Sequence, residues 1–367
     1  MTNFVGRFLF LVKQHTLNSS IYSFMKKPSK IASLTIDEFS STPKYQQLVN
    51  AILNAIKQGV LQKGDAMPSI NELSFQYEIS RVTIEKGYNI LRKMGILEAF
   101  HGKGYFIANT NVSQDIKIFL MFNKLSAHKK LIYDAFVATL ADKAAIDFYV
   151  YNNDYALFKK LLQQQKNEYT HYVIIPHFIE KSDAYRKLID EIPKDKLVLV
   201  GKKLRGITGE FAAVYENFEQ DIYNALSEAL EPLSKYHTLK LIFPVNSYFP
   251  KEIVKGFENF CYNYAFNFKV ISNLDDEAVK EGEVYINLME EDLVKILDKI
   301  ISLNLTVGKQ VGLISYNETP LKNYIMNGLT TISTDFKTMG ITAANLVLEG
   351  SKEHIENPFK LILRGSL

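Results

Sequence analysis

The sequence predicts an α/β protein in two parts, a small winged helix-turn-helix at the N-terminus followed by a bilobed domain of doubly wound parallel sheets. Residues 42–95 contain short helical patterns separated by polar turns, and two strand-like runs around a glycine-rich turn follow directly. Beyond residue 115, short apolar runs of strand length alternate with helical stretches, which is the pattern of parallel sheets. That region is roughly 250 residues long, which favours two lobes over one.

Length, charge and cysteine content bound the kind of protein. With 367 residues the chain is long enough for two or three domains, and its net charge of +3 does not by itself indicate a nucleic-acid binder. Any basic surface must be local, and residues 43–110 carry more Lys and Arg than Asp and Glu. The lone Cys261 excludes an intramolecular disulfide and a cysteine-only zinc site, and it suits a reducing cytoplasm.

The composition shifts along the chain predict four segments. They are a leader at 1–40, the winged helix-turn-helix at 41–109, a polar linker at 110–115 and the large domain at 116–367. The apolar run at residues 8–12 is too short for a signal-peptide core or a membrane span, and no convincing cleavage site follows it. We expect the leader to be disordered, with Met25 as an alternative start to Met1.

The elements of the N-terminal part follow from caps and helical spacing. Thr42-Pro43 supplies a cap and a first-turn proline for a helix. The buried face of that helix is formed by Tyr45, Leu48, Val49, Ile52, Leu53 and Ile56. Ser69 to Glu72 is a capping box for a short second helix, and Ser80 opens a third that ends at Gly95. Residues 96–100 and 105–107 are strand-like and are joined by a tight cationic turn at 101–104.

The third helix is the candidate for the major groove of DNA. Its buried set leaves Lys86 facing outward and places Arg81 and Thr83 at the N-terminal end, where free N–H groups and the helix dipole suit phosphate. Arg81 is also long enough for a bidentate pair with guanine. The glycine-flanked Lys103 lies at a hairpin tip slim enough to meet a backbone or minor groove.

Several strings in this part occur together in a specific order and spacing. They are residues 43–48, 61–69, 80–84 (Ser80-Arg81-Val82-Thr83-Ile84) and 102–106. In these strings the chain resembles the GntR family of bacterial transcription regulators. The resemblance implies DNA contacts from Ser69, Arg81, Thr83, Gly102 and Lys103. Asn71 stands where the family usually has arginine, and it is a candidate contact. Glu85 stands where the family often has arginine, and its carboxylate would repel phosphate unless it accepts from a cytosine amine.

The C-terminal part carries a second set of strings, at residues 311–320, 328–340 and 363–366. In these it resembles the LacI/GalR-type effector domain, which shares its fold with periplasmic sugar-binding proteins. The resemblance implies a small-molecule effector, most often a sugar or sugar derivative, and dimerisation through this domain. In such sheets ligands lie beyond the carboxyl ends of the strands, here in the cleft between the lobes.

The candidate effector contacts are carried over from the matching positions. They are Lys124, Ser126, His128, Lys202, Asn217, Glu290, Glu291 and Thr334. Glu290 and Glu291 are also typical of a charged first turn of a helix, and His128 and His177 of structural or surface positions. Ile253 stands where sugar-binding members usually carry arginine, and Lys202 or Lys124 would restore a cation to the cleft.

The sequence shows no metal-ligand spacing and no GxSxG, Walker or GxGxxG motif, so we expect no enzyme, cofactor or metal. The expected protein is a cytoplasmic, homodimeric transcription regulator that binds a pseudo-palindromic operator in double-stranded DNA and does not bind a membrane. Three alternatives remain: a solute-binding protein, a fusion to a pyridoxal-phosphate aminotransferase and a ligand-blind architectural DNA binder. The second needs a longer C-terminal region and a Schiff-base lysine motif, neither of which is visible.

Overall fold

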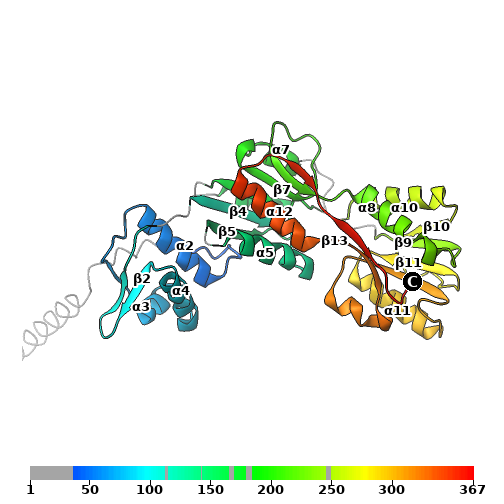
Figure 1. Cartoon of the computed structure of the whole chain (residues 1–367), viewed down its shortest axis with the longest axis horizontal. Helices are drawn as coiled ribbons and strands as arrows, with labels where there is room; N and C mark the ends of the chain where they lie inside the picture. The colour runs from blue at the N-terminus through cyan, green and yellow to red at the C-terminus, as the bar shows by residue number, and fades with distance from the viewer. Residues whose placement is uncertain (1–35, 112–114, 142, 165–168, 179–183, 245–248) are drawn as a thin grey trace, which may run out of the picture. The chain divides into compact units, whose positions relative to one another are not determined.

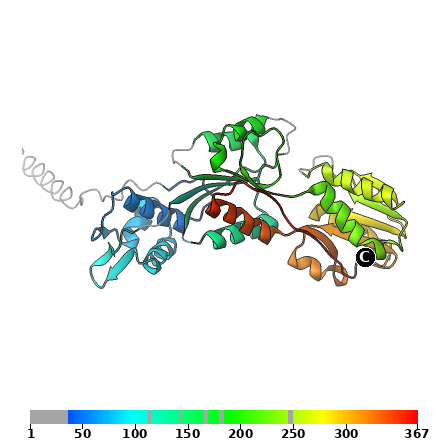
Figure 2. The same ribbon diagram turned by 45° about the horizontal axis from the view of Figure 1, so that its top comes forward.

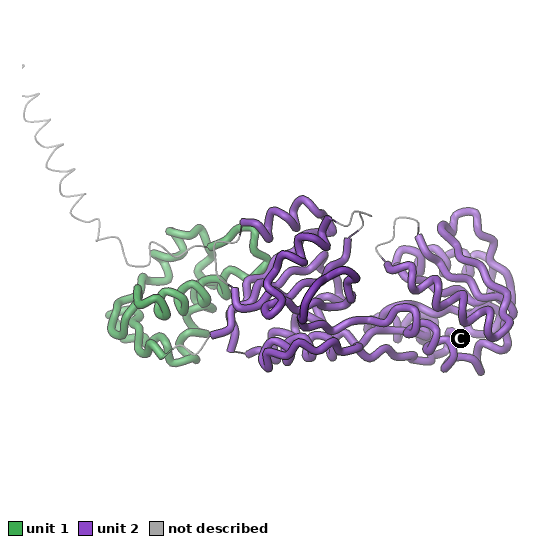
Figure 3. The backbone as a smooth tube through the Cα atoms, turned by 90° about the horizontal axis from the view of Figure 1, so that it is seen from above, with its two compact units in different colours: residues 1–113 green, residues 114–367 purple. Residues whose placement is uncertain are grey.

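The computed structural model describes residues 36–111, 115–141, 143–164, 169–178, 184–244 and 249–367. Their contacts divide the chain into two compact units, residues 1–113 and 114–367 (Figure 3). Most of the predicted leader at 1–40, and the middle of the predicted linker at 110–115, lie outside the described residues. Within the described residues, no helix has both the length and the apolar character needed to span a membrane.

Among the described residues, the first unit contains three helices and a small antiparallel sheet. The helices are α2 (Lys44–Lys57), α3 (Ile70–Tyr77) and α4 (Arg81–Lys93). The strands β1 (Ala66–Met67), β2 (Leu97–Phe100) and β3 (Gly104–Ile107) form a sheet in the order β1-β3-β2 (Figure 1). The predicted three helices and hairpin are therefore confirmed. The additional strand β1 has two residues, too few for a periodic pattern.

Local caps set the helix starts in this unit. The Ser69 Oγ atom accepts from the Glu72 backbone N–H at 3.2 Å, and Glu72 Oε2 accepts from the Ser69 N–H at 2.8 Å, which confirms the predicted capping box. The Ser80 side chain caps α4 by accepting from the Thr83 N–H. The helices share one apolar core that includes Leu48, Ile52, Leu73, Ile84, Tyr88 and Leu91.

The second unit contains two lobes, each a six-stranded sheet with helices on both faces (Figure 2). The sheet of the first lobe consists of β4 (Ile116–Phe122), β5 (Ala144–Val150), β6 (His171–Ile174), β7 (Leu197–Gly201), β8 (Ala212–Tyr215) and β14 (His354–Glu356). All of its pairs are parallel, in the order β5-β4-β6-β7-β8-β14. Its helices are α5 (Ala127–Leu140), α6 (Tyr155–Gln163), α7 (Ala184–Asp190) and α12 (Phe336–Glu349), with the 3-10 turn η1 (Lys194–Lys196).

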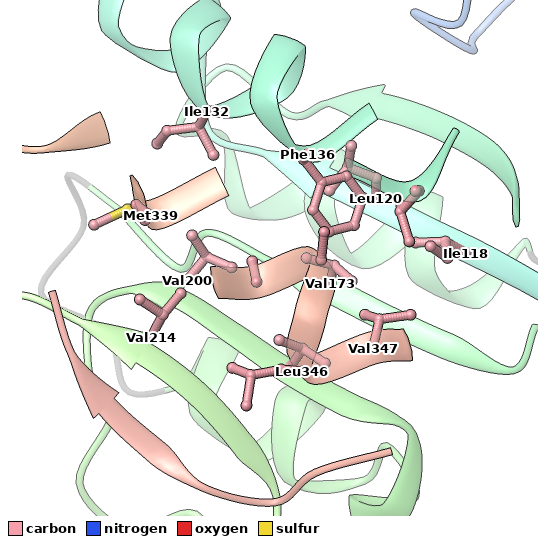
Figure 4. Close-up of a cluster of buried hydrophobic side chains, with 14 of the residues drawn as sticks. Ile118, Leu120, Ile132, Phe136, Val173, Val200, Val214, Met339, Leu346 and Val347 are labelled. Atoms are coloured by element: carbon pink, nitrogen blue, oxygen red, sulfur yellow. The ribbon is translucent and has the colours of Figure 1, made fainter. Parts of the chain in front are cut away.

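One face of this first sheet is covered by α5 and α12. The strands contribute Ile118, Leu120, Val173, Val200 and Val214 to the buried cluster between them (Figure 4). Helix α5 contributes Ile132 and Phe136, and α12 contributes Met339, Leu346 and Val347 (Figure 4). A helix from the far end of the sequence thus completes the first lobe's core.

The second lobe repeats the same winding. Its strands are β9 (Thr238–Ile242), β10 (Asn267–Ile271), β11 (Glu283–Asn287), β12 (Val311–Tyr316), β13 (Thr330–Thr334) and β15 (Phe359–Ile362), in the order β10-β9-β11-β12-β13-β15. Only β15 runs antiparallel, against β13. The helices are α8 (Phe218–Glu228), α9 (Leu230–Leu233), α10 (Glu252–Asn263) and α11 (Glu290–Ser302), with the 3-10 turns η2 (Pro320–Asn323) and η3 (Ile325–Asn327). The predicted doubly wound parallel sheets are confirmed.

In the described part of the chain, three segments pass between the two lobes. The crossings are β8 to α8, β13 to α12 and β14 to β15, and they are hydrogen-bonded to one another. Asn357 N donates to Tyr215 O at 2.8 Å, and Asp335 N donates to Pro358 O at 2.9 Å. The Asn357 side-chain amide adds a bond to Asp335 O at 3.2 Å. Three mutually bonded segments therefore connect the lobes, an arrangement typical of a hinge between lobes.

Gly256 is the point of closest packing between α8 and α10. A Cβ atom there would lie 2.1 Å from Glu219 O and 2.7 Å from Ile222 Cγ2, and the first contact is with backbone. Gly256→Ala is therefore expected to destabilise the second unit by about 1–3 kcal/mol, a fall in Tm of about 2–12 °C. Thermal unfolding followed by circular dichroism measures it.

The neighbouring residue supplies the control for that prediction. Lys255→Ala removes only an exposed ion pair with Glu219, at 2.8 Å, and should cost less than about 1 kcal/mol. Equal Tm values for Gly256→Ala and Lys255→Ala would contradict the prediction, because they would show that α8 and α10 move apart at Gly256 with little loss of stability.

Candidate functional site

The predicted DNA contacts lie on three segments of the first unit. Ser69 and Asn71 are exposed at the start of α3, and Arg81 and Lys86 are exposed on α4. Gly102 and Lys103 are exposed between β2 and β3, and Thr83 is half-buried. The residues facing solvent on α4 are therefore those that helical spacing predicts, while Ile84, Tyr88 and Leu91 fill the core.

The start of α4 is held rigidly by its own side chains. The Ser80 and Thr83 hydroxyls are hydrogen-bonded at 2.8 Å, and Ser80 also caps the helix. Arg81 projects from this capped end, where the helix dipole and backbone N–H groups favour an anion. The Lys86 Nζ atom lies 3.8 Å from the centre of the Tyr45 ring, so within this unit its ammonium is held against α2.

The hairpin tip requires its glycines. Gly102 and Gly104 adopt φ values of +71° and +94°, which side chains other than glycine rarely adopt. Lys103 between them donates its backbone N–H to Phe100 O at 3.0 Å, which closes the turn and leaves the side chain exposed. The tip thus presents one cation on a thin loop.

In the second unit, polar side chains gather at the carboxyl ends of the first lobe's strands. Asn123 follows β4, His177 follows β6, Lys202 follows β7 and Glu216 follows β8. A Cβ atom on Gly201 would lie 3.7 Å from His177 Nε2 and 3.6 Å from Glu216 Oε2, so these two side chains border the same glycine. Lys129 joins them from the first turn of α5. This is the strand edge at which doubly wound sheets bind ligands.

The electrostatics of this cluster are dominated by buried cations. Lys129 is only 8% exposed, and burial lowers the pKa of its ammonium to about 8 although the charge of Glu216 opposes the shift. Burial, followed by the charges of Lys129, Lys202 and Lys124, lowers the pKa of His177 well below its ordinary value. The imidazole is therefore neutral at physiological pH.

Several buried polar atoms in and around this cluster have no hydrogen-bond partner among the residues that the structure describes. In the first lobe they are both ring nitrogens of His177, Asn123 Oδ1 and His128 Nε2. In the second lobe they are Asn287 Oδ1, Ser315 Oγ, the Tyr316 hydroxyl and Asn317 Oδ1, at the carboxyl ends of β11 and β12. Buried polar groups are normally paired, so this concentration of unpaired ones makes the region the candidate ligand site.

The two groups of residues are electrostatically linked. Burial first, and then the charges of Glu216 and Asp221, raise the pKa of Tyr316. Burial lowers the pKa of His128 on α5 to about 4, and the charge of Lys322 in the second lobe adds to the shift. A hydrogen bond with the backbone of Glu318 opposes it. The Thr334 hydroxyl donates to the Glu216 carboxylate across the junction of the lobes. The second lobe's unpaired atoms therefore belong to the same region as the first lobe's cations.

The hinge next to this region also holds a buried acid. Asp221, in the first turn of α8, is 6% exposed and its Oδ2 atom has no partner in the described part of the chain. Burial, and then the charges of Glu216 and Glu356, raise the pKa of Asp221 to about 7. A carboxyl group at the hinge thus changes charge near neutrality.

The sequence-predicted effector contacts divide into two groups. Lys124, His128, Lys202 and Thr334 belong to the cluster, and Glu290 acts on the ammonium of Lys322 beside it. The others are engaged differently: the Ser126 hydroxyl caps α5, Asn217 donates to Glu356 at 3.3 Å, and Glu291 is exposed in the first turn of α11. Ile253 is fully buried in the second lobe's core.

Sequence reasoning missed Lys129, Asn287, Ser315, Tyr316, Asn317 and Lys322, and left His177 as a structural or surface residue. The sequence does predict that the loop from Asn123 to His128 lines the cleft, but Asn123 is not among its polar candidates. Most of the missed residues end a strand or follow one, which is a signal that the strand prediction already contained. Lys129 has no such signal, since it lies within a helix.

Comparison with known proteins identifies the first unit. The model of the bacterial regulatory proteins of the gntR family matches residues 44–107, from the first residue of α2 to the last residue of β3. The chain is 32% identical over 109 residues to the HTH-type transcriptional repressor YtrA of Bacillus subtilis (strain 168), covering 29% of this chain and 80% of YtrA. The chain belongs to the gntR family.

A second relative matches a shorter part of the chain. The probable fructoselysine utilization operon transcriptional repressor of Escherichia coli (strain K12) is 38% identical over 76 residues, which is 21% of this chain and 31% of the relative. This chain therefore matches only about a third of that relative's length.

The remainder of this gntR-family chain has its likeness among solved structures. The Lac Repressor bound to ONPG in the repressed state superposes with a TM-score of 0.57 at 14% identity, covering 78% of this chain and 90% of that one. At this identity the likeness shows the fold alone. The predicted LacI-type, periplasmic-binding-protein-like fold of the second unit is confirmed.

Proposed function

We propose that this gntR-family member is a sequence-specific DNA-binding transcription regulator whose operator affinity is controlled by a small carbohydrate-like effector bound between the lobes of the second unit. The observation that carries the DNA-binding half is the start of α4, an exposed and capped helix N-terminus bearing Arg81 inside a gntR-type unit. The names of both relatives include the word repressor, which supports repression as the direction of control.

The effector half rests on the unpaired buried polar atoms of the second unit. His177, Asn287 and Ser315 each keep polar atoms away from water without a partner among the described residues. Such atoms destabilise the ligand-free chain and are satisfied when a ligand with hydroxyl groups binds. They come from both lobes, so a ligand that pairs with them favours a closed arrangement around the three-strand hinge.

Binding and DNA affinity are coupled if the effector prefers one state of the regulator. A coupling free energy of about 1–3 kcal/mol, equivalent to about 5- to 150-fold in operator affinity, is typical. We further propose a cytoplasmic homodimer in which two first units bind the half-sites of a pseudo-palindromic operator, about one helical turn apart.

The test begins with the full chain and a random duplex library, from which its preferred operator is selected. Operator affinity is then measured by fluorescence anisotropy at fixed salt, in the presence of neutral sugars, uronic acids and sugar phosphates. We expect at least one sugar derivative to change the affinity about 5- to 150-fold. Affinity that stays constant across the panel would identify a ligand-independent DNA binder instead.

A further inference from the structure

We propose that the effector is an anion, a sugar derivative bearing a carboxylate or phosphate, whose acidic group lies between Lys129, Lys202 and His177 of the first lobe. Its hydroxyl groups then meet the neutral side chains at the strand ends of the second lobe. This inference rests on the proposed function, because it names the chemical class of the effector for the same site.

The first argument is the local excess of positive charge. Lys124, Lys129 and Lys202 all act on His177, whereas the carboxylates that act on these lysines are Glu216 for Lys129 and Glu252 for Lys202. The Glu216 carboxylate already accepts a hydrogen bond from Thr334. The region around His177 therefore carries more ammonium than carboxylate charge, in surroundings where burial strengthens every charge interaction.

The second argument is the unbalanced burial of Lys129. Its side chain is 8% exposed, and the charge of the Glu216 carboxylate acts on it without a direct ion pair among the described residues. A buried ammonium without a counter-ion destabilises a folded chain, so lysine is rarely buried in this way without a partner. An anionic ligand supplies the missing counter-ion, and the start of α5 beside it adds the positive end of a helix dipole.

The third argument is the unpaired ring of His177. The side chain is 9% exposed, and neither ring nitrogen has a partner among the described residues. A neutral imidazole donates one N–H and accepts at its other nitrogen, so a ligand bearing both an anionic oxygen and a hydroxyl group satisfies the ring completely. Neutral sugars supply hydroxyl groups but leave Lys129 without its counter-ion.

The fourth argument is the contrast between the two lobes. The unpaired atoms of the second lobe are oxygens of Asn287, Ser315, Tyr316 and Asn317, which are uncharged groups that accept from ligand hydroxyls. The carboxylate of Glu318 nearby is already paired with Arg364 Nη1 at 2.9 Å. The region thus has a cationic side and a neutral hydroxyl-binding side, which matches an acidic sugar held with its acid group in the first lobe.

The test measures ligand affinity by calorimetry with the full chain. The probes are hexoses and pentoses, each as the neutral sugar, the uronic acid and the phosphate monoester. We expect an acidic form to bind at least tenfold more tightly than its neutral parent. Comparison of the uronic acid with the phosphate monoester shows whether the acidic group of the effector is a carboxylate or a phosphate. A neutral parent that binds as tightly as its acids would overturn the anion but leave the proposed function intact. Failure of every sugar would count against both.

Two matched variants separate binding from folding. Lys129→Met removes the buried ammonium, and Lys130→Met removes its exposed neighbour, which pairs with Asp134 on the same helix. We expect Lys129→Met to lose at least tenfold in affinity for the acidic sugar while its ligand-free Tm stays equal or rises, because the uncompensated charge is gone. Lys130→Met should change the affinity less than twofold. A lowered Tm with unchanged affinity for the acid would show that Lys129 is structural and overturn the proposal.

Discussion

Arg81→Ala is expected to lower the affinity of the full chain for its selected operator about 5- to 150-fold. Bidentate pairing of an arginine with a guanine contributes about 1–3 kcal/mol of discrimination, which corresponds to that range. Arg81 is exposed at the capped start of α4, outside the core formed by Ile84, Tyr88 and Leu91. The variant should therefore keep its thermal stability and its response to the effector.

The control replaces an arginine of the same helix at the opposite end. Arg92 is exposed in the last turn of α4, where its Nη1 atom donates to Asn89 Oδ1 at 3.4 Å. Arg92→Ala makes the same change in net charge, so it should weaken operator and random duplex alike, with a smaller salt dependence of binding. Fluorescence anisotropy titrations measure the affinity of Arg81→Ala and Arg92→Ala for the operator and for a random duplex. Retained preference for the operator in Arg81→Ala would refute the placement of α4 in the major groove.

The first unit could be predicted almost completely because its signals are local. The Ser69 capping box and the Ser80 cap each lie within four residues of sequence, and the structure contains both. The buried face of α4 repeats at helical spacing, which fixes the exposed face as well. Short-range rules therefore sufficed to place Arg81 and Lys103 on the surface.

The strands near the junction of the lobes were harder to predict for a physical reason. Strand β13 (Thr330–Thr334) is entirely buried but mostly polar, so it lacks the apolar run by which buried strands are recognised. Its hydroxyls are satisfied by distant partners: Thr330 by Arg364 O and Thr331 by Glu318. Strand β14 has three residues and pairs with β8 through contacts such as Ile355 with Val214. Local sequence patterns cannot predict this pairing, because the paired residues are far apart in the sequence.

The binding region shows the same division between local and non-local information. Resemblance to a known family located Lys124, His128 and Lys202, because those positions follow recognisable strands. It could not show that Lys129 is buried, since a helical lysine is normally solvated and its environment depends on packing. Nor could it show that both ring nitrogens of His177 lack partners among the described residues. The charge of the proposed ligand follows from these two facts.

Lys240 on β9 is the residue whose loss should destabilise the second unit most. Its buried Nζ atom lies 2.7 Å from Glu277 Oε1 and 2.6 Å from Glu283 Oε1, and it donates to the Tyr285 hydroxyl at 3.1 Å. Lys240→Met leaves both carboxylates in place without their shared cation. Removal of one partner from a buried ion pair costs about 3–5 kcal/mol, because the remaining charge stays desolvated. For a unit of this size the expected fall in Tm is about 6–20 °C.

The pH dependence of that loss identifies its cause. Burial raises the pKa of Glu277, but the hydrogen bonds and charges of Lys240 and Lys269 outweigh it, so the pKa lies below its ordinary value of 4.5. A carboxyl group with a lowered folded-state pKa stabilises the fold above its unfolded pKa, and that stability is lost as the pH falls through the folded pKa. In Lys240→Met the Glu277 carboxylate keeps only Lys269, so less of this stabilisation remains to be lost on acidification. The difference in unfolding free energy between wild type and variant should therefore shrink from pH 7 to pH 4.

Lys269→Met is the matched control for this prediction. Lys269 is bonded to the same Glu277 carboxylate at 2.7 Å, but its side chain is 59% exposed, so its loss should cost less than about 1 kcal/mol. Denaturant unfolding at several pH values measures both variants. A deficit in Lys240→Met that is constant from pH 7 to pH 4 would assign the destabilisation to lost packing around the lysine stem instead of to unpaired charge, because packing carries no proton.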